Sequence, residues 1–79
     1  MQAGLLWFDS EPTRTVAVKV AAAAERFQQK FGFAPDVCYI SAKTLNEGEL
    51  SIPFHEGQLR LVPANNILKN HFWIGLAGG

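Results

Sequence analysis

Polar side chains follow two apolar segments of the chain and are the residues best placed to do chemistry. Asp9 and Ser10 come directly after the first segment, whereas Ser41 ends the second and Lys43 lies just beyond it. If both segments are parallel strands, these side chains lie at their carboxyl ends, where open α/β sheets tend to bind ligands. The N-terminus of a helix between the strands would attract an anion to the same place. Asp9, Ser10, Ser41 and Lys43 are therefore candidate ligand-binding residues.

The same residues also have a purely structural interpretation, and the sequence favours it. Asp9 and Ser10 are residue types that cap helices, and Ser41 is suited to cap the turn that follows the second strand. Because this interpretation needs no ligand, we assign no catalytic residue and favour a role other than that of an enzyme.

Histidine and cysteine side chains offer no further site. With Glu56 or Asp9, His55 or His71 could bind a metal or act as an acid–base pair, but no metal-ligand spacing supports this. The lone Cys38 has no disulfide partner and stands in an apolar segment, so we expect a buried free thiol. The sequence therefore predicts no metal and no cofactor.

Three aromatic side chains could form a binding surface. We expect Trp7, Tyr39 and Trp73 on the sheet face away from the helix, where stacked aromatics could bind single-stranded nucleic acid. Seven basic residues are balanced by seven acidic ones, so the surplus of positive charge that attracts phosphates is missing. We therefore expect no nucleic-acid partner. Two alternatives remain open: a place in the core beneath the helix, or the buried centre of a homodimer, where Trp and Tyr are enriched.

Hydrophobic periodicity indicates the elements that position these side chains. A helix is predicted from about Thr13 to Phe31, and Gly32 is a natural stop after it. Pro53 cannot donate a ladder hydrogen bond, so the strand around it should lie at a sheet edge. The predicted strands cover residues 4–9, 36–41, 49–54, 58–62 and 71–76. The fold class is therefore α/β (α+β): a two-layer domain with a mixed sheet of four or five strands, built from a βαβ unit, a β-hairpin and a final strand.

Length and composition place this fold in one small domain that spans residues 1–79. The chain is 48% hydrophobic, and a core of this size leaves a thin margin over the entropy lost on folding. The N-terminus lacks the pattern of a signal peptide, and no apolar run is long enough to span a membrane. We therefore expect a soluble cytoplasmic protein without a membrane partner.

One helix cannot cover both faces of the predicted sheet. Three strands are apolar on both faces, since alternation puts Leu5 and Trp7 on one side and Leu6 and Phe8 on the other. Exposed apolar surface of this kind usually marks an interface. The surplus predicts a homo-oligomer, a dimer or a larger assembly, and leaves an unidentified protein partner as the alternative.

Three segments, Leu5–Asp9, Phe33–Ile40 and Asn70–Gly75, resemble a loose group of short, uncharacterised bacterial α/β proteins. Members of that group have a strand-helix-strand start and a closing aromatic strand. They tend to place His-Pro after the second strand, where this chain has Ser41-Ala42. The resemblance implies a fold and carries over no activity and no site residue.

Taken together, these observations predict a small interaction or structural module that self-associates through its sheet. Trp7, Tyr39 and Trp73 are the candidate interface residues. The alternative is a small-ligand binding protein or enzyme, with an anion site at the carboxyl ends of the two parallel strands.

Overall fold

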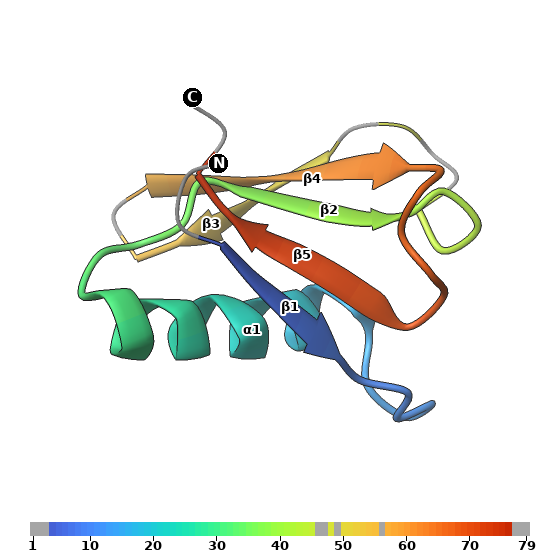
Figure 1. The fold of residues 1–79 in the computed structure, drawn as a ribbon, viewed down its shortest axis with the longest axis horizontal. Coiled ribbons are helices and arrows are strands. Elements are labelled where there is room, and N and C mark those ends of the chain that lie inside the picture. Colours follow the sequence, from blue (N-terminus) through green and yellow to red (C-terminus); the bar gives the residue numbers. More distant parts are fainter. Residues whose placement is uncertain (1–3, 46–47, 49, 56, 77–79) are drawn as a thin grey trace.

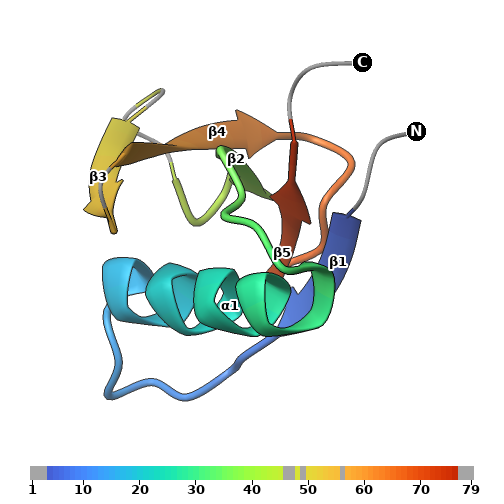
Figure 2. The same ribbon diagram turned by 90° about the vertical axis from the view of Figure 1, so that its left-hand side faces the viewer.

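The computed structural model describes residues 4–45, 48, 50–55 and 57–76. Its elements are β1 (Gly4–Phe8), α1 (Val16–Phe31), β2 (Val37–Ser41), β3 (Leu50–Phe54), β4 (Gly57–Ala64) and β5 (His71–Gly75). The strands form one mixed sheet with α1 against one face (Figure 1). Figure 2 shows that the sheet arches over the helix. The predicted α+β class and the order of elements are confirmed.

The sheet order is β1-β5-β2-β4-β3, so the last strand of the chain lies inside the sheet, between β1 and β2. β5 pairs antiparallel with both β1 and β2, which therefore run parallel to each other with β5 between them. β2 also pairs with β4 in the parallel direction. β3 and β4 form the predicted hairpin, and Pro53 lies on an edge strand as expected.

Local signals at both ends define the helix α1. The Thr15 hydroxyl accepts a hydrogen bond from the Val18 N–H at 3.2 Å, which satisfies a free donor of the first turn. Gly32 takes a left-handed conformation with φ of 84° and donates its N–H to the Gln28 carbonyl. The helix begins after Thr15, later than the predicted start at Thr13, because the Thr15 side chain provides the cap. Among the described residues, no helix has the length and apolarity needed to cross a membrane.

The hydrophobic core lies between α1 and the concave face of the sheet. The helix contributes a fully buried stripe of Val20, Ala23, Ala24 and Phe27. Small alanine side chains in this stripe permit a close approach of the helix to the strands. The buried sheet residues opposite are Cys38, Ile40, Phe54, Leu59, Leu61, Phe72 and Ile74. This packing covers one face of the sheet, and among the described residues no second helix lies over the other face (Figure 2).

Candidate functional site

A row of large apolar side chains crosses the sheet face opposite α1. The strand registers place Leu6, Trp73, Tyr39 and Val62 side by side on neighbouring strands. The Tyr39 and Trp73 rings lie 5.6 Å apart between centroids. Leu6, at the end of the row on β1, is 62% exposed. The row forms an apolar surface that faces away from the core.

A second pair of rings extends this surface along the edge of the sheet. Phe8 is 60% exposed and contacts the His71 ring at a centroid distance of 4.9 Å. The strands β1, β5 and β2 contain no Asp, Glu, Lys or Arg. We call Leu6, Phe8, Tyr39, Val62 and Trp73 the open-face surface.

The candidate interface residue Trp7 does not belong to this surface. Trp7 pairs with Phe72, which is buried on the helix side, and Trp7 itself packs against the core. Its indole nitrogen is shielded from solvent. The expected position on the face away from the helix is therefore wrong for Trp7. Tyr39 and Trp73 do lie on that face.

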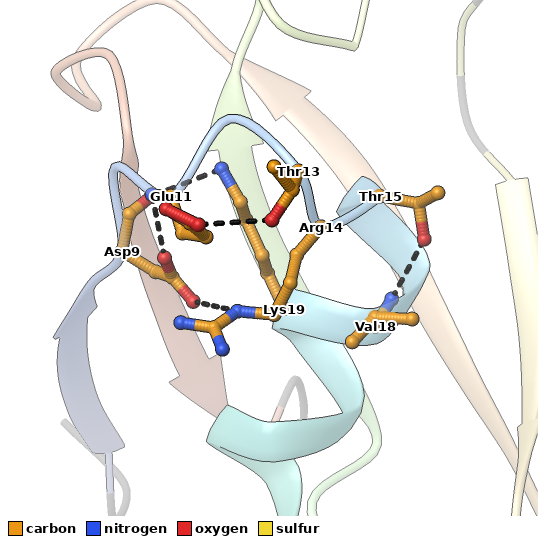
Figure 3. A network of polar contacts seen from close by, with 7 residues as sticks. All are labelled: Asp9, Glu11, Thr13, Arg14, Thr15, Val18 and Lys19. Carbon is orange, nitrogen blue, oxygen red and sulfur yellow. Dashed lines mark hydrogen bonds and ion pairs between the residues drawn. The ribbon is translucent and has the colours of Figure 1, made fainter.

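Asp9 organises the loop between β1 and α1 (Figure 3). Its carboxylate accepts a hydrogen bond from the Glu11 N–H at 2.9 Å and lies 3.3 Å from the Arg14 side chain. Its backbone carbonyl accepts a hydrogen bond from the Lys19 ammonium, and the Lys19 side chain is mostly buried. The bond from Glu11 and the charge of Arg14 lower the pKa of Asp9. These contacts anchor the loop, and Thr15 rather than Asp9 caps the helix.

Ser41 and Lys43 lie apart from Asp9, because β5 stands between β1 and β2. The Ser41 hydroxyl accepts a hydrogen bond from the Lys43 N–H at 3.2 Å. The Ser41 carbonyl accepts further bonds from the N–H groups of Thr44 and Leu45. The structural interpretation of Ser41, as the residue that stabilises the turn after its strand, is confirmed.

A shallow hollow of about 360 Å³ opens at the carboxyl ends of β2 and β4. Its lining is contributed by the turn after β2 and by the connection from β4 to β5. The lining residues are Ser41, Ala42, Lys43, Ala64, Asn65, Ile67, Leu68 and Lys69. The structure thus brings together two of the four candidate ligand-binding residues, Ser41 and Lys43. Asp9 and Ser10 do not line the hollow.

The sequence reasoning missed Asn65 and Lys69 as members of this group. Both follow β4, and only the parallel pairing of β4 with β2 brings them beside Ser41. No local pattern in the sequence indicates that pairing. The two lysines give the hollow a positive character, and the lining contains no carboxylate.

The two histidines lie in different places. His55 follows β3 and contacts the Glu25 carboxylate of α1 at 3.3 Å. The His71 ring bonds to the Lys69 carbonyl at 2.9 Å. Glu56, a possible partner of a histidine, lies outside the described residues. Within the described part of the chain, no group of three or more His, Cys, Asp or Glu side chains could hold a metal ion.

Cys38 is fully buried on β2 beneath the helix, as expected of a free structural thiol. Burial raises the pKa of Cys38 to about 12 because it disfavours the thiolate. At neutral pH the side chain is therefore a small apolar group rather than a nucleophile.

Comparison with known proteins adds no function to this geometry. Neither the family models nor the curated proteins nor the solved structures contain a match to the chain. The open-face surface and the hollow are therefore the features of this chain that bear on its function.

Proposed function

We propose that this protein is an interaction module that self-associates through its sheet. The observation that carries the proposal is the exposure of Leu6 and Phe8, at 62% and 60%, on a sheet with one helix layer. Large apolar side chains that stay in water on a folded surface contribute favourable energy only when a partner covers them. A second copy of the chain is a suitable partner, because its own open-face surface is equally apolar and its strands β1, β5 and β2 are equally free of charged residues.

The gain from covering these side chains offsets part of the cost of bringing two copies together. Full burial of a Leu or Phe side chain stabilises by about 1.5–3 kcal/mol. A symmetric dimer covers part of Leu6 and part of Phe8 in each of its two copies, so four side chains each contribute a fraction of that energy. The same gain supports the fold itself, since a small domain has a thin margin of stability and association adds to it.

Absolute mass in solution tests this proposal. We expect light scattering on a sizing column to show a dimer or larger species that dissociates over a hundredfold dilution. Leu6→Ala and Phe8→Ala should each weaken association by roughly 5- to 30-fold, as the loss of about 1–2 kcal/mol implies. Val18→Ala is the matched control, because Val18 is 50% exposed on α1 rather than on the open-face surface. A monomer at every concentration would contradict the proposal.

The hollow supports a second candidate function, the binding of a small anion. Lys43 and Lys69 come from two different segments and both line the hollow, together with Asn65 and Ser41. Ammonium groups bind phosphate and carboxylate as point charges. The adjacent parallel ends of β2 and β4 are also where α/β sheets tend to bind ligands.

Titration with inorganic phosphate tests the second function. We expect chemical-shift changes centred on Ser41, Lys43 and Lys69 that weaken with added salt, since the Lys43 and Lys69 side chains are exposed to water. Lys43→Gln and Lys69→Gln should each reduce the affinity, and Lys30→Gln on α1 should not. Shifts spread evenly over all surface lysines would contradict a site at the hollow.

A further inference from the structure

We propose that two copies join through β1, with the β1 strands antiparallel around a twofold axis at Leu6. The two sheets then become one continuous sheet. This inference deepens the proposed self-association and rests on it, because it states which part of the sheet makes the contact. β1 is suited to this role because it ends the sheet order and pairs, among the described residues, with β5 alone.

Hydrogen bonds at the end of β1 show which backbone groups point outward. The Asp9 N–H donates to the Asn70 carbonyl, which continues the β1–β5 register as a directly bonded pair. The His71 N–H donates to Leu68 instead of to its opposite residue, Phe8. Directly bonded pairs alternate with unbonded pairs along an antiparallel ladder.

The alternation extends along the whole strand. Leu5 and Trp7 therefore bond to β5, whereas Gly4, Leu6 and Phe8 turn their N–H and C=O groups to the outer edge. An edge of this kind is a template for a further strand.

These outward groups are self-complementary in the antiparallel direction. With the twofold axis at Leu6, the two Leu6 residues form a directly bonded pair. Gly4 of each copy then lies opposite Phe8 of the other. Each outward N–H meets a C=O, so the edge acquires the ladder that it lacks in one copy.

Side-chain packing favours the same register. A twofold axis perpendicular to the sheet keeps the open faces of both copies on one side, so Leu6 contacts Leu6 across the axis. Gly4 has no side chain, and the Trp73 indole occupies the space above it, so that a Cβ at Gly4 would collide with Trp73 Cζ2. Phe8 of the second copy, opposite Gly4, would therefore meet the edge of the Trp73 ring. The exposed Phe8 side chain thereby gains an aromatic neighbour, and neither copy has to change its fold.

Backbone hydrogen exchange, measured by NMR on the unmodified protein, distinguishes this arrangement from other modes of association. Where the dimer exceeds the monomer a hundredfold, we expect the Leu6 and Phe8 amides to exchange about 100-fold more slowly than in the monomer. The Leu5 and Trp7 amides, which bond to β5, should be protected at every concentration and serve as the internal control. A dimer in which the Leu6 and Phe8 amides stay unprotected would overturn the pairing of β1 but leave the proposed self-association intact. A monomer at all concentrations would overturn both.

A pair of substitutions at Leu6 gives an independent test. Leu6→Ala removes the apolar side chain and keeps the outward N–H, whereas Leu6→Pro removes both. Proline is tolerated where the missing N–H faces solvent, so the fold of one copy should survive, as circular dichroism can confirm. We expect Leu6→Pro to leave only monomer under conditions where Leu6→Ala retains a weakened dimer. Equal effects of the two substitutions would overturn the pairing of β1. If Leu6→Pro does not fold, the exchange measurement decides.

Discussion

The two edge strands of the sheet, β1 and β3, differ in almost every property that governs strand pairing. β1 contains no proline and no charged residue, and it exposes Leu6 and Phe8 on the open face. β3 contains Pro53 and leads into a turn at His55, whose φ is 55°. Natural proteins protect sheet edges with prolines, charges and local distortions. By that standard β3 is a protected edge and β1 is not.

The backbone of β3 supports the same contrast. The Arg60 N–H donates to the Asp36 carbonyl on the β2 side, so the neighbouring residues of β4 turn toward β3. Their partners on β3 bond inward, which leaves Ser51 and Pro53 to point outward. Since proline has no N–H, the outer edge of residues 50–54 offers a donor from Ser51 alone. β1 offers donors from Gly4, Leu6 and Phe8. The outer edge of β3 therefore offers few of the backbone donors that a further strand needs, whereas β1 offers them along its whole length.

The largest expected effect comes from a charge placed on the unprotected edge. Leu6→Lys should weaken the dimer on the order of 100-fold, because it removes apolar contact and sets like charges opposite each other across the axis. Leu50→Lys on β3 is the matched control, since Leu50 is 40% exposed on the other edge. Sedimentation equilibrium over a dilution series measures the dimer dissociation constant of each variant. An equal loss of association in the two variants would contradict the claim that β1, and not β3, forms the dimer contact.

Replacing the proline of β3 should give this edge the ability to pair that we propose for β1. Pro53→Thr restores an outward N–H, so each copy would then have two edges able to pair. We expect mass above the dimer at the highest protein concentrations, where unmodified protein stops at the dimer. Ser51→Thr, which changes a side chain on the same edge without adding a donor, should keep the mass of the unmodified protein. Light scattering at rising concentration measures this, and no change in Pro53→Thr would show that proline is not what protects β3.

Local patterns were enough to predict the elements of this fold but not their arrangement. The stop at Gly32 and the edge position of Pro53 depend on a few neighbouring atoms, and both predictions were correct. The insertion of β5 between β1 and β2 depends on pairing between distant segments, which no local pattern encodes. Trp7 was misplaced for a related reason. In an uninterrupted apolar run, alternation separates two faces but does not say which of them meets the helix.

The candidate site shows the same limit. Ser41 and Lys43 were found because they follow a recognisable strand, and they do line the hollow. Lys69 was missed because it joins them only through the position of β4 beside β2. Asp9 was grouped with Ser41 because both follow parallel strands, whereas β5 separates those two strands in the sheet.

A smaller effect is expected where the carboxyl end of β1 is tied to α1. The pKa of Asp9 is lowered in the folded protein, so the carboxylate contributes stability above its ordinary value of about 4. That contribution is lost as the pH falls through the lowered value. Asp9→Asn should therefore unfold at a lower urea concentration at pH 7, and the difference should shrink as the pH approaches 2. Glu11→Gln, which removes a neighbouring charge that bonds to Thr13, is the control. A difference that is independent of pH would show that the charge of Asp9 does not stabilise this end of β1.

The smallest effect is expected at the corresponding end of β3, where His55 contacts Glu25 of α1. Both side chains are about half exposed, at 46% and 55%, and exposed pairs of this kind contribute about 0–1 kcal/mol. Glu25→Gln should lower the free energy of unfolding by less than about 0.5 kcal/mol and leave the dimer unchanged. Urea unfolding of Glu25→Gln, His55→Gln and the double variant measures the coupling between them. Because the core residue Phe54 precedes His55 and is 8% exposed, packing rather than this pair should hold the end of β3. A coupling energy well above 1 kcal/mol would show instead that the His55–Glu25 pair holds the end of β3 against α1.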